Sequence, residues 1–248
     1  MTAVYTVWLR NIKRYFRSKS RIIGSLAQPL LFLLVLGFGL GSIIVSSSGG
    51  VNYLKFITPG IITMSVLFTS IFSGIQIIWD RQFGFLKETL VAPVSRVSIM
   101  IGQTLGGAST AIIQGLILFV ISIFIGGLSI SSGILIALLF MVLIGIGFTA
   151  AGIAVASRMR DMQGFQLIMN FVIMPLFFLS GALFPLTNAP PVLKTITYLN
   201  PLTYGVEGVR YGILGVSSIN PVISLAVMGG FSLLMIVLGA YSFRKMKL

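Results

Sequence analysis

The stretch Asp80-Arg-Gln-Phe-Gly-Phe-Leu-Lys-Glu-Thr-Leu-Val-Ala-Pro-Val-Ser-Arg96 interrupts a chain that carries very few charges elsewhere. It holds two of the four acidic residues and three of the 17 lysines and arginines. An apolar run long enough to cross a membrane lies on either side of it. A segment of this composition belongs in water, so the sequence predicts an exposed connection, residues 80–96, between two membrane-spanning helices.

The composition of the whole chain supports the same class of protein. Only 8% of its 248 residues are charged and 56% are hydrophobic, whereas a soluble domain carries about 25% charged residues. A span needs roughly 20 apolar residues, and several runs reach that length. The ten-residue alternating pattern of a membrane β-barrel is absent. We therefore expect an all-α membrane protein.

Six apolar runs predict six transmembrane helices in a single domain, residues 1–248. They lie at about residues 22–44, 57–79, 99–125, 134–156, 165–184 and 221–241. No charge occurs from residue 97 to residue 157, a stretch long enough for two spans and a tight turn. Fourteen basic residues fall on the side of the two termini and three on the other. Because basic residues favour the cytoplasmic side, this topology predicts a multi-pass protein of the cytoplasmic membrane with both termini in the cytoplasm.

The net charge of +13 then reflects topology, and we expect no nucleic-acid partner. The absence of Cys and His excludes thiol chemistry and the usual zinc ligands. The chain also lacks the G-x-x-x-x-G-K-[ST] loop that cradles nucleotide phosphates. No span carries a charged residue near its middle, which lowers the case for an ion-coupled carrier. The sequence predicts a chain that is not an enzyme and binds no cofactor itself.

The N-terminal segment, residues 1–21, has the pattern of an amphipathic helix. Its apolar residues share one side of a helical projection, and Arg10, Arg14, Arg17 and Arg21 share the opposite side. The apolar residues are Val4, Trp8, Ile12, Tyr15 and Phe16. This split between faces predicts a helix lying in the membrane interface; the simpler alternative is a basic flank that only fixes topology.

Residues 185–220 are broken by prolines and glycines, yet they are too apolar for a hydrophilic loop. We expect two short re-entrant helices on the outer side, near residues 191–199 and 203–214. Irregular backbone at membrane depth must be buried by protein or line a cavity.

Uncharged polar residues lie within the spans: Gln28, Gln76, Gln103, Gln114 and Asn170. The simplest interpretation is hydrogen bonding between helices, worth about 0.6 kcal/mol each. The alternative is that they line a chamber for an amphiphilic substrate.

The cytoplasmic stretch itself has the pattern of a short amphipathic helix. Phe83, Leu86 and Leu90 recur at intervals of three and four and so share one face, while Lys87 and Glu88 offer polar contacts. An ordinary loop has little reason to place Phe83, Phe85 and Leu86 beside water. The pattern favours a docking surface for a partner.

Several motifs together resemble the ABC-2 type transporter permease family, which includes the daunorubicin-resistance-type exporters. They are E-x-L-x-A-P-V-S within residues 88–95, Leu199-Asn-Pro-Leu-Thr-Tyr-Gly-Val-Glu-Gly-Val-Arg210 and Gly181-Ala-Leu-Phe-Pro185. The resemblance covers essentially the whole chain, and it implies that two permease copies pair with two ATP-binding cassette subunits, which hold the ATP and magnesium. It implies a homodimer in membrane lipid, with the first and fifth spans at the interface.

The resemblance also implies roles for particular segments. A connecting helix would include Trp8, Arg10, Arg14 and Arg17. The coupling helix that docks in the ATPase would include Arg81, Phe83, Phe85, Leu86, Lys87, Glu88 and Leu90. The outer gate region would include Asn200, Pro201, Tyr204, Glu207 and Arg210.

The expected function is export of an amphiphilic drug- or lipid-like substrate, driven by ATP hydrolysed in a separate subunit. One alternative is a polysaccharide or glycolipid exporter. That branch of the family tends to have aromatic-rich channel walls, and the sequence shows no comparable aromatic series. Further alternatives are a secondary carrier outside this family and a membrane scaffold.

Overall fold

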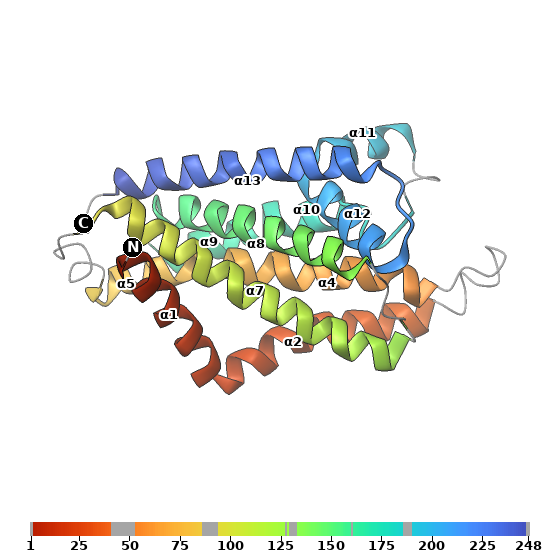
Figure 1. The fold of residues 1–248 in the computed structure, drawn as a ribbon, viewed down its shortest axis with the longest axis horizontal. Helices are drawn as coiled ribbons and strands as arrows, with labels where there is room; N and C mark the ends of the chain where they lie inside the picture. Colours follow the sequence, from red (N-terminus) through yellow and green to blue (C-terminus); the bar gives the residue numbers. More distant parts are fainter. Residues whose placement is uncertain are drawn as a thin grey trace.

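The computed structural model describes residues 2–40, 53–85, 94–126, 128, 133–159, 161–185 and 190–246. All regular secondary structure in these ranges is helical, and the helices form one elongated bundle (Figure 1). The two ends of the chain lie at the same end of the bundle, as an even number of crossings requires. The chain is therefore an all-helical membrane protein, and its described residues form five long apolar helical stretches and a shorter sixth one.

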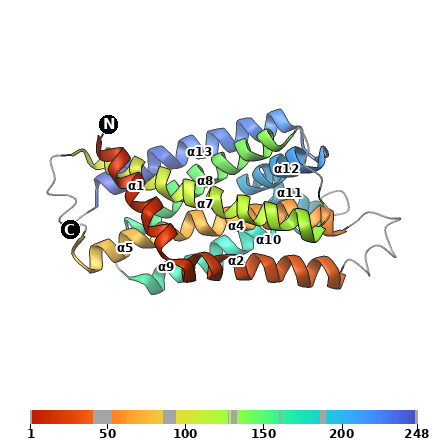
Figure 2. The same ribbon diagram turned by 60° about the horizontal axis from the view of Figure 1, so that its bottom comes forward.

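The N-terminal segment forms α1 (Thr2–Arg17), and Ser18 alone separates it from α2 (Lys19–Leu34). A π-helical turn, η1 (Val35–Leu40), continues α2. The expected first span at 22–44 begins inside α2, and its last residues lie outside the described part of the chain. Figure 2 shows α1 meeting α2 at a sharp elbow, with α2 running along one edge of the bundle.

The expected second span at 57–79 consists of two helices, α4 (Tyr53–Phe72) and α5 (Ile75–Gln82). The interruption at Ser73 and Gly74 coincides with a close crossing of α8. A Cβ added to Gly74 would lie 2.5 Å from the carbonyl oxygen of Gly152. Only glycine allows two backbones to approach this closely.

The core of the bundle is built around α8 (Ile134–Ala156), which packs against α4, α7 (Arg96–Gly126), α12 (Pro201–Leu214) and α13 (Pro221–Arg244). Phe140 and Phe148 of α8 are fully buried, as are Ile61 and Met64 of α4. The expected spans at 99–125 and 221–241 fall within α7 and α13, and the one at 134–156 coincides with α8.

The fifth expected span, residues 165–184, differs from the structure at both ends. The helix runs from Met162 to Phe178 in three parts, α9 (Met162–Ile168), η2 (Met169–Ile173) and α10 (Met174–Phe178). Pro175 has no N–H to donate, and the π-helical turn η2 directly precedes it. The chain then turns, with Gly181 at φ +71°, so the helix ends before Phe184.

The region 185–220 contains two short helices, α11 (Pro191–Leu199) and α12. Asn200 lies between them, and its side-chain oxygen accepts from the backbone N–H of Leu202, 3.0 Å away. Both helices lie at the end of the bundle opposite the termini (Figure 1). Whether they dip into the outer leaflet stays an expectation.

Candidate functional site

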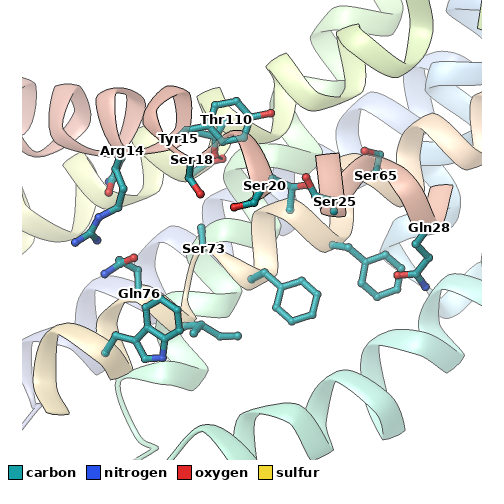
Figure 3. Close-up of a pocket in the computed structure, with 18 of the residues that line it drawn as sticks. Arg14, Tyr15, Ser18, Ser20, Ser25, Gln28, Ser65, Ser73, Gln76 and Thr110 are labelled. Atoms are coloured by element: carbon teal, nitrogen blue, oxygen red, sulfur yellow. Dashed lines mark hydrogen bonds between the residues drawn. The ribbon is translucent and has the colours of Figure 1, made fainter. Parts of the chain in front are cut away.

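A cavity of about 820 Å³ opens between α1, α2, α4, α5 and α7, with Met162 of α9 at its edge (Figure 3). Its walls mix hydroxyl and amide groups with apolar side chains. The polar members include Ser18, Ser20, Ser25, Gln28, Ser65, Thr69, Ser73, Gln76, Gln103 and Thr110. Arg14 is the one charged side chain in the lining, which contains no carboxylate among the described residues. A surface of this kind suits an amphiphilic molecule.

The five polar residues that we expected inside the spans differ in whether they line the cavity. Gln28, Gln76 and Gln103 line the cavity. Gln103 also accepts a hydrogen bond from the Asn11 side chain at 2.6 Å, and Gln114 accepts one from the Tyr15 hydroxyl. For Gln103 the two interpretations are compatible, because its side chain both bonds to α1 and lines the cavity.

Four aromatic side chains also reach the cavity: Tyr15, Phe68, Phe72 and Trp79. They come from α1, α4 and α5, and the ring centroids of Phe68 and Phe72 lie 6.4 Å apart. The sequence shows no aromatic series, and these four side chains form an aromatic part of the cavity wall that no sequence pattern indicates. The residues are spread over 65 positions of sequence, and only the fold brings them together.

The N-terminal helix α1 is anchored to α7 by side chains of its expected apolar face. The indole N–H of Trp8 donates to the Ser109 hydroxyl at 3.0 Å, one turn before the Asn11 bond and two turns before the Tyr15 bond described above. Phe16, expected on the same face, is instead 56% exposed. Much of the apolar face that we expected to contact the membrane therefore packs on protein. Arg17 is exposed on the other side of the helix.

Asp80 is the hub between α1 and α5. Its carboxylate is 5% exposed and lies 3.2 Å from the Arg10 guanidinium and 3.9 Å from that of Arg14. The Gln76 amide donates to its other oxygen at 2.8 Å. Buried carboxylates are stable when they are paired in this way. Sequence reasoning named both arginines as connecting-helix residues and did not name Asp80 as a site residue.

The expected coupling helix, residues 81–90, is not one continuous helix. α5 ends at Gln82, and Gly84 has φ +80°, a left-handed conformation that ends a helix. The Arg81 guanidinium donates to the Met159 carbonyl at 2.9 Å and so holds α5 to the turn after α8. Phe83 and Phe85 are 72% and 53% exposed. Leu86, Lys87, Glu88 and Leu90 lie outside the described residues.

Two of the five expected outer gate residues form a buried ion pair in α12. Glu207 and Arg210 pair within that helix, and both are almost fully buried. Arg210 also donates to the Gly181 carbonyl at 2.9 Å and lies over the Phe56 ring, 4.2 Å from its centroid. The second oxygen of Glu207 accepts from the backbone N–H of Ser218. The pair therefore connects α12 with α4, with the turn at Gly181 and with the segment that contains Ser218.

The other three expected gate residues lie at the start of α12. Asn200 donates to the Leu176 carbonyl at 2.6 Å and so ties α12 to α10. The Tyr204 hydroxyl donates to the Tyr198 carbonyl at 2.9 Å. Pro201 is the first residue of α12, a position where its missing N–H costs nothing.

Comparison with known proteins finds relatives over nearly the whole chain, in the same family that its motifs resemble. A family model described as ABC-2 type transporter matches residues 2–214. The chain is 29% identical over 230 residues to the inner membrane transport permease YadH of Escherichia coli strain K12, covering 91% of this chain and 88% of that one. It is 32% identical over 206 residues to the putative transport permease ycf38 of Porphyra purpurea, with coverages of 82% and 70%. The chain is 28% identical over 211 residues to nodulation protein J of Sinorhizobium fredii, with coverages of 84% and 80%.

Proposed function

Because this chain belongs to the ABC-2 type transporter family, we propose that it is the membrane subunit of an exporter driven by ATP that a separate subunit hydrolyses. The chain binds the substrate and provides its path, and the partner supplies the energy. Two copies of this chain pair with two ATP-binding subunits, in keeping with the family resemblance of its motifs.

The observation that carries the proposal is the position of α5 between the exposed Phe83 and the cavity. Ile75, Gln76 and Trp79 of α5 line the cavity, Asp80 bonds to α1, and Phe83 is exposed just beyond the last turn. Eight residues of helix span about 12 Å. A push on Phe83 would therefore move the cavity wall and α1 together.

The cavity supports an amphiphilic drug- or lipid-like substrate. Apolar side chains such as Met64 and Phe68 lie beside hydroxyl groups such as Ser65 and Thr69. An amphiphile can place its apolar part on the first set and its polar part on the second. Binding sites for small molecules commonly combine an apolar wall with a few polar groups in this way.

A polysaccharide or glycolipid is the second candidate, and one observation favours it. Tyr15, Phe68, Phe72 and Trp79 present aromatic surface to the cavity, and the channel walls of the polysaccharide branch tend to be aromatic-rich. A glycolipid would use both features, because its sugar can lie on the aromatic rings and its lipid can contact the apolar wall.

The proposal is tested by replacing Phe83 with serine in the complex of permease and ATP-binding subunit. We expect Phe83→Ser to reduce co-purification of the ATP-binding subunit and to abolish substrate-stimulated ATP hydrolysis. Phe124→Ser is the matched control, because Phe124 is also highly exposed, at 84%, but lies near the far end of α7. Phe124→Ser should leave assembly and stimulation unchanged.

The same experiment tests the orientation of the chain. ATP is hydrolysed in the cytoplasm, so a subunit that docks at Phe83 places that end of the bundle, and both termini with it, in the cytoplasm. Full assembly and stimulation in Phe83→Ser would refute the docking assignment. An ATP-binding subunit that crosslinks to the α11–α12 end would refute the orientation.

A further inference from the structure

A second hollow lies at the elbow where α1 meets α2, and its lining is strongly basic. It is an open hollow of about 820 Å³. The lining residues are five cations and two serines: Arg10, Lys13, Arg14, Arg17, Ser18, Lys19 and Ser20. No described carboxylate lines it. We call this hollow the elbow pocket.

The elbow pocket and the amphiphilic cavity are neighbours with a common wall. Arg14, Ser18 and Ser20 line both of them. A molecule with its head in the elbow pocket could therefore extend past these three residues into the cavity, where it would meet Phe68 and Phe72.

The charge of the elbow pocket is only partly balanced by the protein. Asp80, which is not among the lining residues, pairs with Arg10 and Arg14 and is itself almost fully buried. Within the residues that the structure describes, Lys13, Arg17 and Lys19 form no ion pair. Five cations around one hollow repel one another, and an anion placed among them would relieve that repulsion.

The position of the elbow pocket matches the level of lipid headgroups. The apolar stretch of α2 that could cross the membrane begins at Ile22, directly after the pocket residues. Lys and Arg next to a span end lie where anionic headgroups are found.

We propose that the elbow pocket and the cavity together bind one amphiphile with an anionic headgroup, such as a phosphate. The cations hold the headgroup, the hydroxyl groups of Ser18 and Ser20 donate to it, and the apolar part lies in the cavity. This inference rests on the proposed function, and it narrows the substrate class, because a cationic amphiphile would be repelled at the entrance. The same headgroup chemistry is found in an exported lipid and in a resident bilayer lipid.

The test compares two brominated lipids as quenchers of tryptophan fluorescence in the purified full-length chain in detergent micelles. Trp79 lines the cavity, so a bromine-labelled acyl chain bound there quenches it. We expect phosphatidic acid to reach half-quenching at a mole fraction at least about fivefold lower than phosphatidylcholine, since even one nearby Lys or Arg contributes about fivefold. The Trp79→Phe variant should lose this headgroup-dependent signal.

A triple substitution, Lys13→Gln with Arg17→Gln and Lys19→Gln, should reduce the preference to about twofold or less. The matched control is Arg158→Gln with Arg244→Gln and Lys245→Gln, three exposed cations just after α8 and at the end of α13, outside the elbow pocket. The control should keep the preference. Equal quenching by the two lipids in the unmodified chain, or an equal loss in both triple variants, would overturn the proposal.

A second experiment distinguishes an exported lipid from a resident bilayer lipid as the molecule that is bound. The complex with the ATP-binding subunit is placed in phosphatidylcholine vesicles that contain fluorescent phosphatidic acid. ATP-dependent movement of the probe between leaflets identifies the bound lipid as the transported class, whereas preferential binding without movement identifies a resident lipid. Because the quenching test needs no ATP, it stays informative even if ATP-driven export fails.

Discussion

Two of the three acidic side chains in the described part of the chain are buried in ion pairs, and the pairs lie in different parts of the bundle. Asp80 joins α1 to α5, and Glu207 joins α12 to its surroundings through Arg210 and Ser218. The third, Asp161, is exposed and accepts from the backbone N–H of Gly164 at 2.6 Å. Buried charges are costly unless they are paired, so each buried pair fixes a junction between segments.

Replacing Arg210 with methionine should strongly destabilise the protein. The substitution leaves the Glu207 carboxylate buried with only the Ser218 N–H as a described partner, and breaking one half of a buried pair costs about 3–5 kcal/mol. Resistance to SDS-induced unfolding measures the loss.

The matched control removes both charges. The double variant Glu207→Gln with Arg210→Met leaves no uncompensated ion, so we expect it to be more stable than Arg210→Met alone. A double variant that is less stable than Arg210→Met would show that the Glu207 charge has a stabilising partner other than Arg210.

Replacing Asp80 with asparagine should loosen α1 from α5. The substitution keeps the side-chain shape and removes the charge that pairs with Arg10, at an expected cost of about 1–2 kcal/mol, because Arg10 is partly exposed. A double-mutant cycle with Arg10→Met measures the coupling between the two side chains.

Asp161→Asn is the control for Asp80→Asn, since asparagine caps a helix about as well as aspartate. It should leave stability nearly unchanged. A coupling energy near zero between Asp80 and Arg10 would contradict the assignment of Asp80 as the hub.

In the pairs around Asp80, the sequence predicts the positions of the two arginines better than that of their acidic partner. The face of Arg10 and Arg14 follows from helical periodicity, because it depends on neighbours three and four residues apart. Their partner Asp80 lies 70 positions from Arg10, and no local pattern connects the two. The spacing of Glu207 and Arg210 permits a pair in one helix, but the contacts with Gly181 and Phe56 depend on the packing of α12.

At the scale of elements, α4 and α5 cross α8 at a point where both sides need glycine. A Cβ on Gly152 would lie 2.7 Å from the carbonyl oxygen of Ile71, and backbone atoms cannot move aside as a flexible side chain can. We expect Gly152→Ala to force the two elements apart, at a cost of about 1–3 kcal/mol. SDS unfolding measures the stability, and ATP hydrolysis measures coupling through α5.

Gly230→Ala in α13 is the matched control, because nothing lies within 4 Å of a Cβ built there. Alanine is the better helix former by about 1 kcal/mol, so this variant should be neutral or slightly more stable. Equal stability of Gly152→Ala and the unmodified chain would mean that the crossing has more room than its geometry indicates.

Apolar runs predict where the long helices lie, because lipid requires both length and apolarity. They do not predict where a helix is interrupted. The turn at Gly74 depends on contact with Gly152, and the separation of α5 from the residues after Gly84 depends on a left-handed glycine. The prolines near residues 190 and 200 do mark α11 and α12, since proline at the first position of a helix is a local signal.

At the scale of the whole molecule, the buried and exposed surfaces are unequally distributed. Figure 2 shows α2, α9 and α10 along one edge of the bundle and α13 along the opposite one. In the apolar stretch Ile22–Gly39 of α2 and η1 only 17% of residues are buried, against 67% in the most apolar 18-residue window of Tyr53–Gln82. Lipid can cover either edge, but the cavity opens beside α2, so covering that edge with a second copy would also enclose the substrate path.

The dimer proposed above can be tested cleanly because the chain contains no cysteine. Single cysteines at exposed positions of α2 and η2, such as Leu31→Cys and Phe171→Cys, should crosslink two copies through a short bismaleimide. Leu31 and Phe171 are 59% and 76% exposed, so these changes remove no buried contact within one chain. Leu233→Cys on α13, where Leu233 is 66% exposed, is the control and should remain monomeric on a denaturing gel. Crosslinking at Leu233 and none along α2 and η2 would place the second copy against α13, and the cavity would then open to lipid and not to a partner chain.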